Sequence, residues 1–257
     1  MLIQRILPGK FGAAVKGMYK FSGVVDLVSG WDTPAVNRGV AEVRRVIGNE
    51  ANTTGLAPLM SVDTEFPVWG DRTVALIQVG NPEYALLVRT RIGKEKLPLL
   101  PVELCDLLRD PSIEKVGSRI KADVTKINTA WPDAKIDAEA HNYMELKPIV
   151  LEKCPTRSNK YGLKDMCKSV LGYDLDKSPK LQCSDWRKDA DLTEDQIRYA
   201  AGNLNPNRNR NPFGNRVPIP FPNPTACNPK RGRGRRCTLR DLQASDAVAG
   251  SVRSVPV

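Results

Sequence analysis

Short apolar runs separated by turn residues divide the first half of the chain into strands. Residues 59–62 form an apolar run, interrupted only by Ser61, of the kind that builds a buried strand. Residues 59–63, 73–79 and 84–89 follow one another closely, so they predict an antiparallel meander of three strands. Shorter strands are expected at residues 24–28, 115–117 and 131–136.

Segments with apolar residues at helical spacing surround and follow these strands. Asp32 and Pro34 mark a helix start, because a capping side chain followed by Pro favours the first turn. This helix is expected to run to Gly48, with a loop over residues 52–55. Strands in series, then strand–helix alternation, then helices predict an α/β fold: a mixed sheet with helices on both faces. Further helices are expected at residues 100–108, 121–127, 141–153, 162–171 and 193–201.

The positive charge of the chain is concentrated at its C-terminal end. The net charge of the whole chain is +10. Residues 203–257 hold ten Lys and Arg side chains and two Asp and Glu, a net charge of +8, which leaves +2 for residues 1–202. Eight of the twenty Pro residues also lie in this segment. Such a composition buries too little apolar surface to order itself, so we expect a disordered basic tail over residues 204–257.

Composition disfavours several classes of protein. No run of 18 apolar residues exists, so no membrane span is expected. The first residues also lack the apolar region of a secretory signal peptide. Six scattered Cys without a Cys-x-x-Cys pair indicate reduced intracellular thiols. His141 is the only histidine, which leaves little material for Ser-His-Asp or Cys-His catalysis. Residues 1–23 are basic and are interpreted as an N-terminal extension or a mitochondrial presequence, so nuclear, cytoplasmic and mitochondrial locations stay open.

Three acidic side chains are candidates for a metal site. Asp63 and Glu65 follow the apolar run and lie two residues apart, which places both carboxylates on one face of a strand. Close carboxylates repel each other, and a divalent cation is their usual stabiliser. An isolated pair of this kind is better explained as a solvated strand end. For Asp123 the structural alternative is an acid in the first turn of a helix, where the helix dipole favours it.

These acids, together with a later aromatic motif, resemble a known family. Asp63-Thr-Glu65 is followed by Asp123 and then by Tyr199-Ala-Ala-Gly-Asn203. The ordered set resembles the DEDD 3′–5′ exonucleases, in the tyrosine subfamily that includes ribonuclease D and the Werner-syndrome-type exonuclease. The likeness extends over most of the chain, up to Asn203. One position departs from the family, because the Tyr-x-x-x-Asp motif ends here in Asn203.

The resemblance implies a ribonuclease-H-like fold and a site for two divalent ions, Mg²⁺ or Mn²⁺, which prefer hard carboxylate oxygens. By this resemblance Asp63 would bridge both ions. Glu65 would bind the ion on the side of the nucleophile, and Asp123 the ion on the side of the leaving group. Tyr199 would orient the attacking water, with a packed helical aromatic as the alternative. Asn203 would stand at the fourth ligand position with a neutral amide, which weakens binding of the nucleophile-side ion.

The expected function is metal-dependent 3′–5′ exonuclease activity on single-stranded ends of RNA or DNA. The alternative is a catalytically inactive nucleic-acid-binding or adaptor protein that keeps the fold. Residues 24–203 are assigned to the exonuclease domain, with its last helix cut short, between the extension 1–23 and the tail 204–257.

Aromatic and basic side chains outside the acidic set are candidates for contact with nucleic acid. Phe66 and Trp69 follow the first motif and are suited to stack a terminal base, with core or loop packing as the alternative. Lys177 is expected to hold the helical region together and not to contact substrate. The tail contains a basic run that either binds nucleic acid, acts as a nuclear import signal or is simply solvated; its candidate residues are Arg231, Arg233, Arg235 and Arg236.

Overall fold

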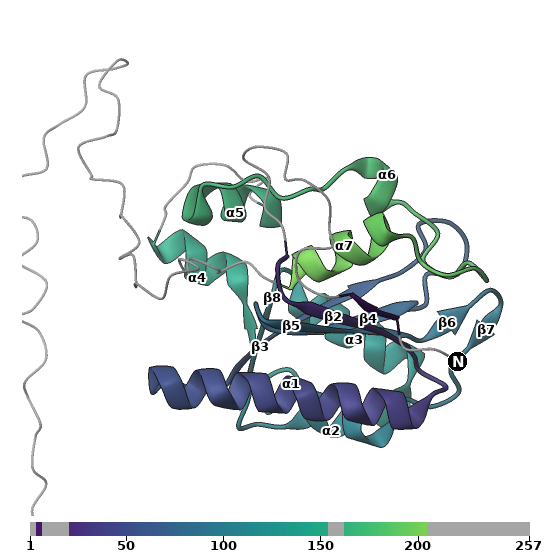
Figure 1. Ribbon diagram of the computed structural model, residues 1–257, viewed down its shortest axis with the longest axis horizontal. Coiled ribbons are helices and arrows are strands. Elements are labelled where there is room, and N and C mark those ends of the chain that lie inside the picture. The colour runs from purple at the N-terminus through teal and green to yellow at the C-terminus, as the bar shows by residue number, and fades with distance from the viewer. Residues whose placement is uncertain (1–3, 7–20, 154–161, 205–257) are drawn as a thin grey trace, which may run out of the picture. The chain divides into compact units, whose positions relative to one another are not determined.

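The computed structural model describes residues 4–6, 21–153 and 162–204, and these form a mixed seven-stranded sheet (Figure 1). In chain order its strands are β1 (Gln4–Ile6), β2 (Val24–Ser29), β3 (Leu59–Glu65), β4 (Leu76–Gly80), β5 (Tyr84–Arg89), β8 (Glu114–Gly117) and β9 (Tyr143–Glu145). Their order across the sheet is β1-β2-β5-β4-β3-β8-β9. β4 pairs antiparallel with both β3 and β5, so the predicted meander is confirmed. A separate small hairpin consists of β6 (Arg91–Ile92) and β7 (Glu95–Lys96).

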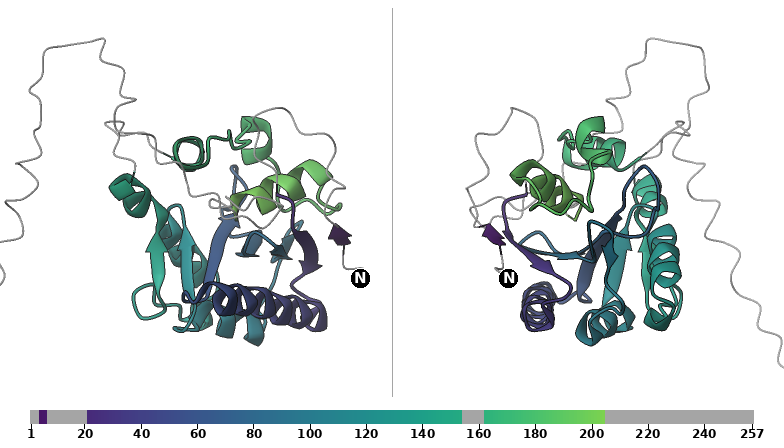
Figure 2. Two further views of the ribbon diagram at one scale, coloured as in Figure 1. Left: turned by 60° about the vertical axis from the view of Figure 1, so that its left-hand side comes forward. Right: turned by 90° about the vertical axis from the view of Figure 1, so that its right-hand side faces the viewer.

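Helices cover both faces of the sheet, as predicted (Figure 2). They are α1 (Thr33–Thr54), α2 (Val102–Arg109), α3 (Ile120–Ala130), α4 (Leu146–Lys153), α5 (Leu163–Leu171), α6 (Pro179–Gln182) and α7 (Glu194–Asn203). α1, α2 and α3 share one apolar core with the sheet, and α7 shares a second core with the opposite face. The mixed α/β architecture expected from the sequence is therefore confirmed.

The central strands are apolar along their whole length because both faces are covered. In β5 every residue is buried. Leu86 and Val88 belong to the core under α1, while Ala85 and Leu87 belong to the core under α7. This double burial fixes the position of the meander. It therefore fixes the end of β3, which carries the first candidate acids.

α1 is longer than the sequence indicated. It begins at the predicted cap, Asp32. The expected end at Gly48 and the loop over residues 52–55 are wrong. The helix continues to Thr54. Gly55 caps its C-terminus with a left-handed φ of 70°. A Gly inside a helix costs only about 1 kcal/mol relative to Ala, and burial of the apolar face of α1 outweighs that cost.

The segment between α3 and α4 also differs from the prediction. No strand forms over residues 131–136, because Pro132–Ala134 is a 3₁₀ turn and Lys135 is left-handed. The apolar side chains that suggested a strand are buried in the core instead. The strand at this edge is β9, parallel to β8. It takes up the start of the helix predicted over residues 141–153, so α4 begins only at Leu146.

Some sequence predictions concern segments outside the described residues. These are residues 1–3 and 7–20 of the N-terminal extension and residues 205–257 of the tail. Of the extension, the structure describes β1 and residues 21–23. β1 pairs antiparallel with β2 at the edge of the sheet. In the described ranges no helix is both long and apolar enough to cross a membrane. The cysteines of these ranges are free thiols: Cys105, Cys167 and Cys183.

Candidate functional site

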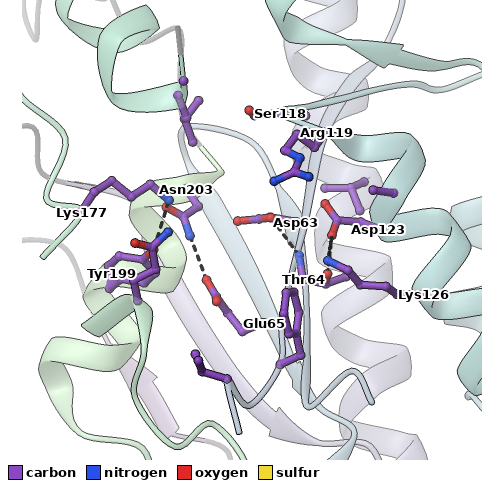
Figure 3. Close-up of a pocket in the computed structure, with 18 of the residues that line it drawn as sticks. Asp63, Thr64, Glu65, Ser118, Arg119, Asp123, Lys126, Lys177, Tyr199 and Asn203 are labelled. Carbon is purple, nitrogen blue, oxygen red and sulfur yellow. Dashed lines mark hydrogen bonds and ion pairs between the residues drawn. The ribbon is translucent and has the colours of Figure 1, made fainter. Parts of the chain in front are cut away.

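The end of β3 carries two candidate acids into a cleft. Asp63 and Glu65 leave the same face of the strand, as predicted, because side chains alternate along it (Figure 3). Thr64, between them, leaves the other face. Glu65 is only 8% exposed. Antiparallel pairing places Gln78 of β4 opposite Asp63, so the register of the sheet fixes both carboxylates.

α3 brings the third acid to the same cleft. The chain turns from β8 into α3 at Arg119, whose φ of 65° is left-handed. Asp123 lies in the first turn of α3 and is 5% exposed. Its Oδ1 accepts hydrogen bonds from Thr64 Oγ1 at 2.6 Å and from Lys126 Nζ at 3.1 Å. Thr64 therefore ties α3 to β3 at the site.

α7 supplies the last two predicted side chains. Thr193 and Gln196 form a capping box at its start, which fixes where the helix begins. Tyr199 and Asn203 lie four residues apart and therefore share one face of the helix. Asn203 Nδ2 donates a hydrogen bond to Glu65 Oε1 at 3.0 Å. Asn203 is the last residue of α7, so the helix reaches the site before it ends.

Lys177 contacts both of these α7 side chains. It lies in the segment before α6, and its Nζ donates to Asn203 Oδ1 at 2.7 Å and to the Tyr199 hydroxyl at 3.2 Å. The ammonium group also lies 4.8 Å from the centre of the Tyr199 ring, a cation–π contact. The expectation that Lys177 only holds the helical region together is therefore incomplete, because its charge lies beside the acids.

The three acids, Lys177 and the Tyr199 and Asn203 side chains line one cleft with a volume of about 920 Å³. The acids come from β3 and α3, and the aromatic and amide groups come from α7. Negative charge at the centre, bordered by cations, is the pattern expected of a site that holds a phosphate next to metal-binding carboxylates. The basic side chains that line the cleft are Arg72, Arg119, Lys126, Lys164 and Lys177.

Burial raises the pKa of all three carboxylates, and repulsion by a neighbouring acid adds to the increase at Asp63 and Glu65. Burial, and after it the negative charge of Asp123, raises the pKa of Asp63 to about 6. Burial and the charge of Asp63 raise the pKa of Glu65 well above its usual range. Burial also raises the pKa of Asp123, although the hydrogen bond from Thr64 opposes the increase. The folded chain therefore holds these acids at a free-energy cost.

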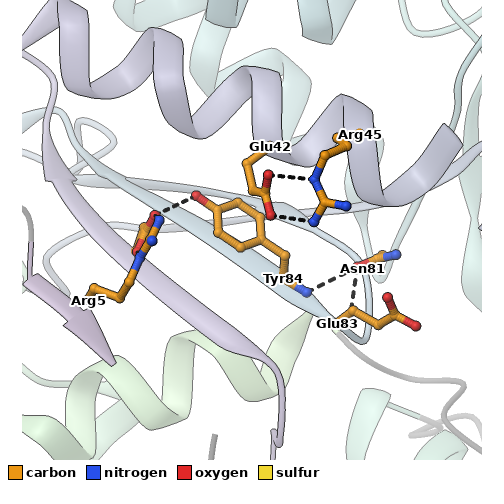
Figure 4. Close-up of polar contacts among 7 residues, drawn as sticks. Arg5, Glu42, Arg45, Asn81, Glu83 and Tyr84 are labelled. Carbon is orange, nitrogen blue, oxygen red and sulfur yellow. Dashed lines mark hydrogen bonds and ion pairs between the residues drawn. The ribbon is translucent and has the colours of Figure 1, made fainter. Parts of the chain in front are cut away.

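Asp26 on β2 shows how the same chain stabilises a buried acid with its own groups. Figure 4 shows its two partners, Arg5 and Tyr84. Asp26 is 4% exposed. Arg5 places Nε 2.7 Å from Oδ1 and Nη2 2.6 Å from Oδ2 of this carboxylate, and Tyr84 donates its hydroxyl to Oδ2 at 2.8 Å. A bidentate Arg pair of this geometry compensates the buried charge. The raised pKa values in the cleft indicate that its acids lack equivalent compensation.

The donor set of the cleft fits a hard divalent cation, which would relieve this repulsion. Asp63 is coupled electrostatically to both Asp123 and Glu65, so it belongs to two candidate ligand pairs. Within the described ranges, no three acidic, His or Cys side chains converge closely enough to hold one ion by themselves. The arrangement therefore offers pairs of carboxylates that share Asp63, with substrate and water needed to complete any coordination.

Asp63→Asn is expected to stabilise the metal-free protein at about pH 7.5 by roughly 1–3 kcal/mol. The pKa of Asp63 rises from 3.8 to about 6 on folding, so the folded state binds the proton more tightly. The contribution of Asp63 to stability is therefore complete below about pH 4 and is lost as the pH rises through about 6. Denaturant unfolding in the presence of chelator, at pH values on either side of this range, measures the difference. The exposed Asp133→Asn is the control, and an equal wild-type-to-variant difference at both pH values would contradict the argument.

The remaining predicted binding residues differ in their placement. Phe66 lines the cleft, and Lys126 Nζ lies 3.8 Å from the centre of its ring. Trp69 is 79% exposed and is not among the side chains that line the cleft. The basic candidates of the tail lie outside the described residues: Arg231, Arg233, Arg235 and Arg236.

The sequence reasoning missed Thr64 and four of the five basic side chains of the cleft, since it named only Lys177 among the five. Lys126 follows Asp123 by three residues in a helix, and this spacing alone indicates that they share a face. Thr64 gives no such signal, because alternation turns it away from Asp63 and Glu65. Only the packing of α3 beside β3 brings its hydroxyl to Asp123.

Comparison with known proteins gives a consistent result. A family model described as 3′–5′ exonuclease matches residues 42–203. The chain is 30% identical over 170 residues to human exonuclease 3′-5′ domain-containing protein 2, covering 60% of this chain and 26% of that protein. It is 31% identical over 145 residues to a 3′-5′ exonuclease of Drosophila willistoni, covering 55% of this chain and 39% of the relative. The matched region thus spans less than half of the length of either relative.

Among solved structures, the chain is similar to the EXO domain of Nibbler from Aedes aegypti. The TM-score is 0.52 at 19% sequence identity, covering 70% of this chain and 82% of that domain. This similarity concerns the fold. Together with the mixed sheet and its two helical layers, it confirms the ribonuclease-H-like α/β fold expected from the sequence.

Proposed function

Because the chain belongs to the 3′–5′ exonuclease family, we propose that it removes nucleotides from the 3′ end of single-stranded nucleic acid, with Mg²⁺ or Mn²⁺ as cofactor. One observation carries this proposal: Asp63, Glu65 and Asp123 line a single cleft bordered by cations. Tyr199 joins them from α7. Separate segments of the chain thus bring together groups that are suited to phosphodiester hydrolysis, which supports the proposal.

The carboxylates are the groups suited to hold the divalent ions, with Asp63 common to both candidate pairs. A bound divalent ion supplies an acidified water at neutral pH and neutralises charge on the phosphate. The protein keeps the carboxylates in place on regular elements, β3 and α3, which position side chains more accurately than loops do. The hydrogen bond from Thr64 to Asp123 supports this placement.

Tyr199 is suited to orient the attacking water. Burial, and after it the charge of Glu65, raises the pKa of Tyr199, so the hydroxyl stays protonated at neutral pH. Lys177 Nζ donates to the hydroxyl oxygen at 3.2 Å. An ammonium group accepts no hydrogen bond, so the hydroxyl proton stays available for an acceptor in the cleft. A water held in this way is placed for attack without an entropic cost at the moment of reaction.

The walls of the cleft are suited to bind the phosphate backbone without reading sequence. Arg72, Arg119 and Lys164 present positive charge there. Contacts of this type give affinity that falls with salt and depends little on the bases. Phe66 lies in the same cleft, which makes it a better candidate than the exposed Trp69 for stacking the terminal base.

The test is degradation of a 5′-labelled single-stranded oligonucleotide by the purified full chain in Mn²⁺. We expect a ladder that shortens from the 3′ end, stops on chelation and does not form when the 3′ end is blocked. RNA and DNA of the same sequence are compared in parallel. An intact oligonucleotide under all these conditions, with fully folded protein, would refute the proposal.

A second candidate function is nucleic-acid binding without hydrolysis. Asn203 favours it, because the amide donates a hydrogen bond to Glu65 at the position where the family motif has a fourth acid. A neutral amide weakens attraction for a cation and leaves water less acidified. Retention of the oligonucleotide without shortening, measured in the same assay by gel shift, would select this function over the first.

Deleting residues 205–257 is expected to weaken nucleic-acid binding more at low salt than at high salt. The reason is the net charge of +8 over residues 203–257. Each phosphate that the tail neutralises contributes about 0.7 to the slope of log affinity against log salt for single strands. Deletion of the tail should reduce the slope by that amount for each such phosphate. Fluorescence anisotropy at several salt concentrations measures the slope. Deleting only residues 241–257, which removes two acids and one Arg, is the control, and equal slopes in all three proteins would exclude a contribution of the tail.

A further inference from the structure

The five basic side chains of the cleft differ in what already binds them. Two of them, Lys126 and Lys177, donate hydrogen bonds to other groups of the site. In the part of the chain that the structure describes, the side chains of Arg72, Arg119 and Lys164 form no hydrogen bond or ion pair. These three therefore keep their donors available for a substrate.

Arg119 is held in a left-handed backbone conformation, which few residues other than Gly, Asn and Asp adopt. Its φ is 65° and its ψ is 31°. Its N–H donates to Glu145 Oε2 at 2.9 Å, and its carbonyl oxygen accepts from the Ala122 N–H at 2.9 Å. Because the groups on both sides of its Cα are bonded, the direction in which the side chain leaves the backbone is fixed. Figure 3 shows the guanidinium group on the side of the cleft where Asp63 and Asp123 lie.

Glu145 holds this turn from the neighbouring strand. It is the last residue of β9, and parallel pairing places it beside Gly117 at the end of β8. Its Oε1 accepts a second hydrogen bond, from the Lys121 N–H at 3.2 Å. One carboxylate thus binds two N–H groups at the start of α3, where negative charge is favourable. The turn that carries Arg119 is therefore braced from outside the cleft.

The turn itself does not require an arginine. Gly or Asn would take the left-handed conformation at a lower cost. What Arg119 adds is a positive charge near the acids: burial raises the pKa of Asp123, and Arg119 is one of the charges that oppose the increase. A guanidinium group is always charged, and its planar donors match the oxygens of a phosphate.

We infer that Arg119 is a catalytic residue that binds the phosphate of the cleaved bond, and that Glu145 positions it. This inference rests on the proposed hydrolysis and assigns a further residue to it. A donor that is fixed before the reaction stabilises the negative charge that develops on the phosphate oxygens in the transition state. Its loss should therefore lower the rate at saturating substrate and not only the affinity.

Single-turnover hydrolysis of a 5′-labelled oligonucleotide by the full chain in saturating Mn²⁺ tests the role of Arg119. Fluorescence anisotropy in chelator measures the affinity in parallel. Arg119→Asn removes the charge but suits the left-handed turn, so denaturant unfolding should show unchanged or increased stability. We expect the rate at saturating oligonucleotide to fall about a hundredfold and the affinity to fall at most about threefold. Arg119→Gly is measured beside it, so that the test does not depend on one variant folding.

Lys164→Gln is the matched control, because it removes a positive charge from the same cleft. Lys164 is not among the main charges that shift the pKa values of the three acids. We expect this variant to change the affinity more than the rate at saturating oligonucleotide.

Glu145→Gln tests the positioning role. The variant keeps the size of the side chain, but its NH₂ group cannot accept one of the two N–H groups. We expect the rate to fall about tenfold in the wild type and much less in Arg119→Asn, because the guanidinium group that Glu145 positions is already absent there. An equal loss in both backgrounds would show that Glu145 only supports the fold of α3.

Wild-type rates in both neutral Arg119 variants would overturn the inference, and so would a loss that is confined to affinity. Failure of the proposed function looks different, because the wild type itself would then leave the oligonucleotide intact.

Discussion

Asp63→Asn is expected to lower the rate of 3′-end hydrolysis by at least about a thousandfold, which corresponds to about 4 kcal/mol of transition-state stabilisation. The effect is large because Asp63 is coupled to both Glu65 and Asp123, so one neutral amide removes charge from both candidate ligand pairs. The shape of the side chain is nearly unchanged, so packing in β3 is kept. Single-turnover degradation of a 5′-labelled oligonucleotide in saturating Mn²⁺ measures the rate.

The control for this variant is Asp133→Asn, which makes the same chemical change at an exposed position outside the cleft. We expect it to retain the wild-type rate. Because Asp63→Asn is also expected to stabilise the metal-free protein, lost activity with unchanged or increased stability excludes unfolding as the cause. A rate within about tenfold of the wild type would remove Asp63 from the reaction, because each factor of ten is only about 1.4 kcal/mol.

Asn203→Asp is expected to raise Mn²⁺-dependent hydrolysis by roughly two orders of magnitude, or about 3 kcal/mol. The variant places a carboxylate beside Glu65 in place of the amide that now donates to it at 3.0 Å. Two acids at that position attract a cation, and the donor that occupied Glu65 Oε1 is gone. The gain should be larger at limiting Mn²⁺ than at saturation, since part of it is metal affinity. Initial rates across a Mn²⁺ titration measure both parts.

Asn49→Asp is the matched control for this gain, because it adds the same charge on the exposed side of α1, which packs on the other face of the sheet. It is expected to leave the titration curve unchanged. Activity of Asn203→Asp that stays flat at every metal concentration would show that residue 203 does not limit the reaction.

The sequence predicted those parts of the site that depend on local geometry. The two-residue spacing of Asp63 and Glu65 predicts a shared strand face, and the structure has it. The helix expected over residues 193–201 is also present, but α7 continues to Asn203, which the sequence analysis did not predict and which places Asn203 on the same face as Tyr199. The meander and the helices on both faces were also predictable, because periodicity and short connections encode them.

The parts that escaped prediction depend on long-range packing. β9 has only three residues and pairs with β8 across the whole of α3, so no local pattern identifies it. Lys177 is a single lysine in an irregular segment, 26 residues before the amide that it contacts. α1 continues through Gly48 because tertiary burial outweighs a local helix preference.

Anomalous X-ray diffraction from crystals of the full chain soaked in Mn²⁺ is the most direct test of the central claim that this cleft is a divalent-metal site. The account predicts a strong anomalous peak within coordination distance of the carboxylate oxygens of Asp63 and of at least one of its two neighbours, Glu65 and Asp123. The peak should disappear in Asp63→Asn crystals. A soaked crystal without any peak at these carboxylates would contradict the account.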